Sequence, residues 1–174
     1  MRKLILLLVA AVVTLFIIGC PPPIDLEYEL TVIIDGQGDV FKDPDREKYP
    51  HGEEVELEAF PHDGWEFSHW SGDIEGTERI QTLVMDEDKE ATAHFDQIMH
   101  TITLEANPAE GGEVHGDGTY PKGTYVTVTA EAYENYTFHN WTEDGKVVHE
   151  QPEYSFYLVE NRNLVANFVF MPEP

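Results

Sequence analysis

Residues 49–70 read YPHGEEVELEAFPHDGWEFSHW, and residues 120–141 read YPKGTYVTVTAEAYENYTFHNW, so the chain contains the same segment twice without a gap. The identical residues recur at a spacing of 71 positions, as in Tyr49 with Tyr120 and Trp70 with Trp141. A repeat of this length indicates that each copy is one supersecondary unit or small domain. The sequence therefore predicts two tandem modules.

Apolar and polar residues alternate in both copies, which is typical of strands with one buried face. Val55, Leu57 and Ala59 alternate with glutamates in the first copy, and Val126, Val128 and Ala130 take their places in the second. In the opening strands we expect inward side chains at Leu30, Val32 and Ile34 of the first copy and at Ile102, Leu104 and Ala106 of the second. In the closing strands we expect them at Ala91, Ala93 and Phe95 of the first copy and at Leu164, Ala166 and Phe168 of the second. Short strands between Gly, Pro, Asn and Asp predict an all-β fold of two small antiparallel modules, β-grasp-like or small sandwich repeats.

Phe67 and Trp70 are three residues apart and would face opposite sides of a regular strand. Either a bulge turns one ring toward the core, or Trp70 caps an end of the core beneath the Ser71-Gly72 turn. Phe138 and Trp141 keep the spacing, so the arrangement belongs to the fold.

Two further features concern the connections. Gly36-Gln37-Gly38 and Gly111-Gly112 are expected to form the tight turns after the opening strands, where glycine tolerates positive φ. The closing strands recur at a spacing of 73, so a two-residue insertion is expected between Trp141 and Leu158.

The amino terminus begins Met1-Arg2-Lys3, continues as an apolar run to Ile18, and ends in Gly19-Cys20. A basic start and a short apolar stretch are typical of a signal peptide, here a hydrophobic signal helix, and not of a membrane span. Ile17-Ile18-Gly19-Cys20 resembles the bacterial lipobox, which implies lipidation of Cys20 and cleavage before it. The alternative is an ordinary secretory signal with an incidental cysteine. Lipidation would attach the protein to a membrane of the bacterial cell envelope, facing outside the cytoplasm.

The composition of the chain limits which kinds of partner the protein can bind. After cleavage the chain would have 155 residues (174 − 19) and a formal charge of −26, from eight basic and 34 acidic side chains. Such a surface repels nucleic acid and anionic lipid headgroups. Cys20 is the only cysteine, so no disulfide can form within the chain.

The segment Gly64-Trp65-Glu66-Phe67-Ser68-His69-Trp70-Ser71-Gly72, followed by the strand that ends at Phe95, resembles the divergent InlB B-repeat family. The motif residues of the two copies are Gly52, Phe67, Trp70 and Phe95, then Gly123, Phe138, Trp141 and Phe168. The second copy departs from the family pattern at Asn135, Thr142-Glu143 and Val159–Asn163. The resemblance implies small β-rich modules of bacterial surface proteins and no catalytic activity.

The expected boundaries are a signal peptide at 1–19, a lipidated and proline-rich tether at 20–27, modules at 28–97 and 98–170, and a tail at 171–174.

Candidate chemistry is sparse. Asp86-Glu87-Asp88-Lys89-Glu90 imitates the start of a calcium loop, but Ala91 and Gln97 stand where glycine and glutamate are needed, so a solvated hairpin turn is the better interpretation. The eight histidines form no zinc-like pair, and no nucleophile motif appears. We expect no metal, no cofactor and no enzymatic activity.

The leading hypothesis is a non-enzymatic envelope lipoprotein whose modules contact envelope proteins or cell-wall glycan, as an adhesion or structural module. The alternative is a carbohydrate-binding surface lipoprotein that uses exposed aromatic rings, for which Tyr133 and Tyr154 are the first candidates because they lie outside the repeated pattern. An accessory role in a larger envelope assembly is not separable from the first hypothesis by sequence.

Overall fold

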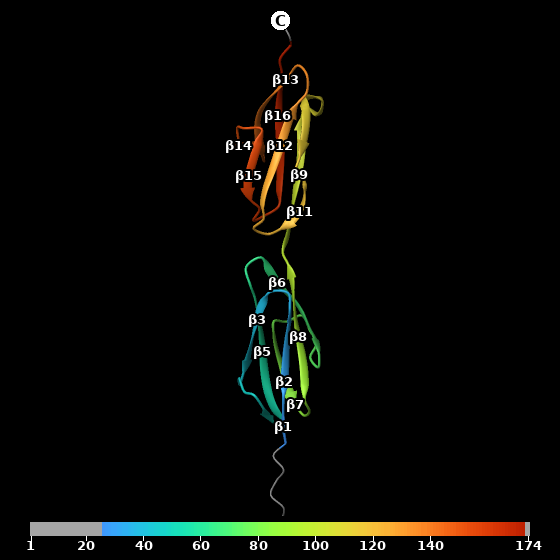
Figure 1. The fold of residues 1–174 in the computed structure, drawn as a ribbon, viewed down its shortest axis with the longest axis vertical. Helices are drawn as coiled ribbons and strands as arrows, with labels where there is room; N and C mark the ends of the chain where they lie inside the picture. Colours follow the sequence, from blue (N-terminus) through green and yellow to red (C-terminus); the bar gives the residue numbers. More distant parts are fainter. Residues whose placement is uncertain (1–25, 173–174) are drawn as a thin grey trace, which may run out of the picture.

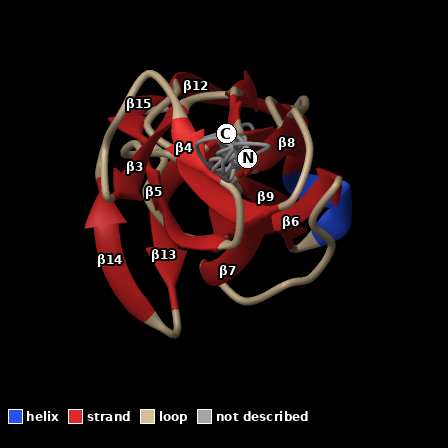
Figure 2. Ribbon diagram, turned by 90° about the horizontal axis from the view of Figure 1, so that it is seen from below, coloured by secondary structure: helices blue, strands red, loops and turns tan. Residues whose placement is uncertain are grey.

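The computed structural model describes residues 26–172, and apart from one short 3₁₀ turn (Ala109–Gly111) all regular elements there are β-strands (Figures 1 and 2). This confirms the all-β prediction. The signal helix and Cys20 lie outside the described residues. Within 26–172, no helix is long and apolar enough to cross a membrane.

The first module contains β1 (Glu27–Tyr28), β2 (Leu30–Asp35), β3 (Gly38–Asp43), β4 (Tyr49–Pro50), β5 (Glu53–Pro61), β6 (Trp65–Gly72), β7 (Ile80–Met85) and β8 (Lys89–Gln97). Two three-stranded sheets, ordered β2-β8-β6 and β3-β5-β7, enclose one hydrophobic core, and β1 pairs with β4. Without a described helix to cover a sheet, the module is a small sandwich rather than a β-grasp.

The second module contains β9 (Met99–Asn107), β10 (Gly112–His115), β11 (Gly118–Pro121), β12 (Tyr125–Ala132), β13 (Tyr136–Glu143), β14 (Lys146–His149), β15 (Glu153–Tyr157) and β16 (Arg162–Phe170). Its sheets are ordered β11-β9-β16-β13-β14 and β10-β12-β15, around a separate core. The two-tandem-module prediction is confirmed.

Strand pairing is antiparallel, as expected, with one exception in each module. The opening strand pairs in parallel with the closing strand, β2 with β8 and β9 with β16. Since parallel neighbours run in the same direction, the chain enters each module at one end and leaves it at the other. Figure 1 shows the result: β8 runs onward into β9, and the modules lie end to end.

A β-bulge places both motif rings in the core. The register of β6 against β8 shifts between Phe67 and His69, and that of β13 against β16 shifts at the matching place. The extra residue lets Phe67 and Trp70 face the same side, with ring centroids 5.4 Å apart. Trp70 is 1% exposed and Trp141 0% exposed. The bulge is therefore the correct one of the two sequence alternatives.

Three sequence expectations for individual positions have a clear outcome. The alternating residues of β5 and β12 are buried as expected, but Ile34 is 44% exposed, because β2 lies at the edge of its sheet. Positive φ occurs at Gly36 but not at Gly38, nor at Gly111 or Gly112. Those two glycines instead leave room for the Phe168 ring, since a Cβ on Gly112 would lie 2.4 Å from the ring.

The two-residue insertion lies in the β13–β14 connection. Trp70 bridges to Gly76 in the first module, and Trp141 pairs with His149 in the second, so the spacing changes from 71 to 73 between these points. The insertion extends a short bridge into the strand β14.

Ile98 alone connects β8 to β9, and both of its backbone polar groups are used. Its N–H donates to the carbonyl of Gly64 in the first module at 2.9 Å, and its carbonyl accepts from the N–H of Lys122 in the second at 2.8 Å. The Lys122 ammonium also donates to the carboxylate of Asp63 at 2.8 Å. That hydrogen bond and the positive charge hold the pKa of Asp63 below its usual value. These contacts, called the joint below, tie the modules together on two sides of Ile98.

Each of the two backbone hydrogen bonds of Ile98 has a counterpart at one outer end of the two-module structure. His51 N–H donates to the Leu26 carbonyl, as Lys122 does to Ile98, and Met171 N–H donates to Asn135, as Ile98 does to Gly64. Asn135 has φ of 65°, close to the 83° of Gly64. Asparagine tolerates this conformation better than other non-glycine residues, which explains the departure from glycine in the second copy.

Replacing Trp70 with alanine should lower the free energy of unfolding by about 3–5 kcal/mol, because a buried indole leaves a large cavity. Urea denaturation followed by tryptophan fluorescence measures the change, with Phe41→Ala on the exposed face as the control. A loss below about 1 kcal/mol would contradict the buried position of Trp70.

Candidate functional site

Four polar side chains lie side by side on the outer face of the sheet β2-β8-β6. Asp35, His94 and His69 occupy directly paired positions on adjacent strands, and Ser71 follows on β6. His94 Nδ1 lies 2.9 Å from Asp35 Oδ2, and His94 Nε2 lies 2.8 Å from Ser71 Oγ. The rings of His69 and His94 stack with centroids 4.3 Å apart. We call these four residues the polar row.

The distances within the polar row match those of a nucleophile, a base and an orienting carboxylate. Acyl transfer also requires preorganised donors for an oxyanion and a site that excludes water. Here the carboxylate of Asp35 is 71% exposed, and Ser71 sits within the β6–β8 ladder on an open sheet face. The row therefore has the contacts of a triad, but its carboxylate is open to water instead of buried.

The second module shows what the row does structurally. Asn107, Asn167, Asn140 and Thr142 take the positions of Asp35, His94, His69 and Ser71. The Asn107 amide donates to Asn167 at 3.0 Å, and the Asn167 amide donates to Asn140 and Thr142 at 2.9 and 3.0 Å. The same strands are linked without any ionisable group. The polar row is thus a cross-strand hydrogen-bond network that the first module builds from titratable side chains.

The acidic turn between β7 and β8 has an equally structural role. Asp88 accepts a hydrogen bond from the N–H of Glu29 at 2.9 Å, and Asn161 accepts the matching bond from Thr101 at 2.8 Å. Lys89 lies 2.8 Å from Asp86, and its hydrogen bond lowers the pKa of that carboxyl group. Among residues 26–172, no group of three or more His, Cys, Asp or Glu side chains is arranged to hold a metal ion.

In place of the acidic turn's lysine, the second module has Arg162. Its guanidinium Nε donates to both oxygens of Glu143, at 2.8 and 2.7 Å. The guanidinium carbon Cζ lies 4.6 Å from the centre of the Phe156 ring. Burial is the largest single influence and lowers the pKa of Arg162, but the hydrogen bonds and charge attraction to Glu143 and Tyr154 together outweigh it, so the net shift is upward. This pair explains two departures from the family pattern, at 143 and 162.

Tyr133 and Tyr154, the aromatic residues singled out by sequence, lie in different surroundings. Tyr133 is exposed, and its backbone N–H donates to the carbonyl of Gly111. Tyr154 is half-buried at the edge of the second core, stacked on His149 with centroids 4.5 Å apart and packed against Phe156. The two rings do not form a common surface.

A different aromatic pair is exposed on the second module. Tyr125 on β12 and Tyr157 on β15 occupy directly opposite positions, with ring centroids 5.0 Å apart. They are 61% and 68% exposed. Alternation along β12 indicates that Tyr125 points outward, but only the pairing of β12 with β15 brings Tyr157 beside it, and that pairing is not readable from the local sequence.

The motif residues serve the scaffold. Phe67, Trp70 and Phe95 pack together in the first core, as Phe138, Trp141 and Phe168 do in the second. Gly52 and Gly123 both have φ of 83°, and a Cβ on either would meet no atom within 4 Å. Backbone conformation, not space, requires glycine at these two positions.

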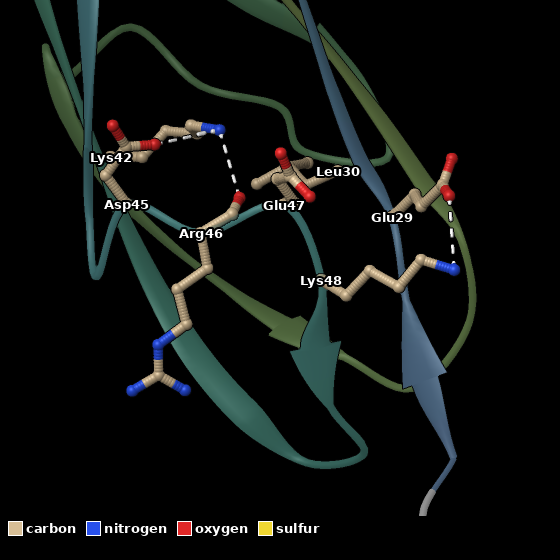
Figure 3. A pocket seen from close by; sticks show the side chains of 7 residues that line it. All are labelled: Glu29, Leu30, Lys42, Asp45, Arg46, Glu47 and Lys48. Atoms are coloured by element: carbon tan, nitrogen blue, oxygen red, sulfur yellow. Dashed lines mark hydrogen bonds and ion pairs between the residues drawn. The ribbon is translucent and has the colours of Figure 1, made fainter.

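A shallow pocket of about 540 Å³ lies beside the 44–48 loop of the first module, lined by Glu29, Leu30, Lys42, Asp45, Arg46, Glu47 and Lys48 (Figure 3). The basic side chains that line this pocket are already paired with acidic side chains. Lys42 pairs with Asp45 at 3.1 Å, Arg46 with Glu53 at 3.0 Å, and Lys48 with Glu29 at 3.5 Å. Charge compensation leaves little attraction for an anion here.

Comparison with known proteins agrees with the repeated architecture. The family model for the divergent InlB B-repeat domain matches residues 28–99 and, separately, residues 102–171. Searches of the curated proteins and of the solved structures found no match.

If the polar row is only a cross-strand network, Ser71 has no unusual nucleophilicity. Incubation with a fluorophosphonate probe should label neither the natural chain nor Ser71→Ala, as read by intact mass. An active serine hydrolase treated in parallel is the positive control. Labelling of the natural chain that disappears in Ser71→Ala and in His94→Asn would contradict this reading.

Proposed function

The chain belongs to the divergent InlB B-repeat family, and from that premise we propose that it is a non-enzymatic lipoprotein of the bacterial cell envelope whose two modules form a short stiff rod. The rod presents an acidic surface to envelope proteins or cell-wall glycan, as an adhesion or structural module. The observation that carries the proposal is the joint at Ile98.

The joint supports a rod because it leaves no flexible residue between the modules. A glycine- and serine-rich linker of even a few residues behaves as a random coil, whereas Ile98 is held by one hydrogen bond on each side. The Asp63–Lys122 pair adds a contact away from the chain axis. A stiff connection fixes the distance between a membrane anchor and whatever the second module contacts.

The negative charge of the surface limits which kinds of partner the protein can bind. Glu54, Glu56 and Glu58 line the outer face of β5, and the whole chain has 34 acidic residues against 10 lysines and arginines. Nucleic acid and anionic headgroups are poor partners for such a surface. Proteins with basic or uncharged surfaces and cell-wall glycans fit better.

Edge strands offer one mode of contact with proteins. β14 lies at the edge of the five-stranded sheet, and β7 lies at an edge in the first module. Val147 on β14 and Val84 on β7 are both exposed. An extended segment of a partner could add to either edge through backbone hydrogen bonds.

Anchoring through Cys20 would hold the rod close to the bilayer. Five residues lie between Cys20 and Leu26, the first described residue, and three of them are prolines. At about 3.1 Å per residue, a polyproline-like tether of this length spans roughly 20 Å. The first module would then stand next to the headgroups and the second farther out.

Labelled palmitate should be incorporated into the natural chain and not into Cys20→Ser, because the thiol at position 20 carries the lipid. Pro21→Ala, which leaves the cysteine in place, should incorporate as much label as the natural chain. Fluorography of the immunoprecipitated protein after growth of the bacterium with the label reads the result. Equal labelling of Cys20→Ser, or none of the natural chain, would contradict the lipoprotein assignment.

A further inference from the structure

The outer face of β12 and β15 differs in chemistry from the rest of the molecule. Three cross-strand pairs follow one another there: Tyr125 with Tyr157, Thr127 with Ser155, and Thr129 with Glu153. The hydroxyl oxygens of Thr127 and Ser155 lie 2.7 Å apart. Aromatic rings are therefore followed directly by hydroxyl groups, and a carboxylate lies at the far end.

The matching face of the first module carries charge at these places. Glu54, Glu56 and Glu58 of β5 stand where β12 has Tyr125, Thr127 and Thr129, and they pair with Val84, Thr82 and Ile80 of β7. The three β12 positions carry no charge, so Glu153 of β15 is the one charged side chain among the three cross-strand pairs. The scaffold is the same in both modules, so packing does not account for the change.

The two tyrosine rings also contribute little to the module itself. Most of each ring is exposed, and the aromatic contact that each makes is with the other, at an interplanar angle of 55°. A cross-strand aromatic pair stabilises a sheet by about 0.2–1 kcal/mol. An exposed aromatic surface of this kind is typical of a contact site.

We propose that the outer face of β12 and β15 binds an uncharged saccharide chain, with Tyr125 and Tyr157 as the stacking surface. Sugar rings present apolar C–H faces that pack on aromatic rings, while their hydroxyl groups hydrogen-bond to Tyr, Thr, Ser and Glu side chains. This proposal specifies the class of partner for the proposed envelope function, and it rests on that function.

Charge selects a neutral saccharide over other ligands. The paired positions of this face include no lysine or arginine to hold a sulfate, phosphate or uronate group. A cationic ligand would prefer the glutamate-lined face of the first module. An uncharged glycan meets no like charge at the Tyr125–Tyr157 and Thr127–Ser155 pairs, and the Glu153 carboxylate can accept a hydrogen bond from its hydroxyl groups.

Binding can be tested with the full-length chain solubilised in detergent. The probes are hexasaccharides of N-acetylglucosamine, glucose and xylose, with a hexasaccharide of galacturonic acid as the charged comparison, and the readout is isothermal calorimetry. At least one neutral probe should bind, and Tyr125→Thr with Tyr157→Thr should weaken it at least tenfold. Phe41→Thr, which removes an equally exposed ring from the first module, should change affinity less than twofold.

Circular dichroism of the double variant checks that the module remains folded. Three results would overturn the proposal: no neutral probe binds, the double variant binds as well as the natural chain, or Phe41→Thr weakens binding equally. None of these results bears on palmitate labelling or on the stiffness of the joint. Failure of the saccharide site is therefore distinguishable from failure of the lipoprotein and rod proposals.

Discussion

Parallel pairing of the opening and closing strands determines how the molecule is assembled. Because β2 lies parallel to β8, and β9 to β16, each module begins at one end and finishes at the other. An antiparallel pair at the same place would bring the two chain ends to the same side and fold the modules back on each other. With the parallel pair, the last strand of one module leads directly into the first strand of the next, and one residue suffices to connect them.

Each module repeats the same hydrogen bonds with different side chains. Asp88 and Asn161 accept hydrogen bonds from backbone N–H groups at equivalent positions of the two modules, and Asn107 and Asn167 replace Asp35 and His94 of the polar row. The first module uses ionisable groups where the second uses amides. What is common to both is scaffold, and the Ser–His–Asp contacts of the first module stand where the second module has its amide network. Functional differences are to be sought where the outer faces diverge, as at Tyr125 and Tyr157.

Much of the fold was predictable because it depends on residues that are close together in the sequence. Alternation identified the inward residues of β5 and β12, and the repeated Phe-x-x-Trp spacing indicated a bulge or an end cap. Strand direction was not predictable, since alternation is the same for parallel and antiparallel neighbours. Gly111 and Gly112 were assigned to positive φ, but the Phe168 ring that requires them lies more than fifty residues away in sequence. Tyr157 was missed as a partner of Tyr125 for the same reason: the contact depends on pairing between distant strands.

The most direct test of the rod is the distribution of distances between the modules. Spin labels at Glu56→Cys and Glu113→Cys, in a chain that also carries Cys20→Ser, place one probe on the outer face of each module. Double electron–electron resonance should give a single narrow distribution, and insertion of two glycines after Ile98 should broaden it. A natural linker that gives a distribution as broad as the glycine-extended one would contradict the stiff joint, and with it the rod.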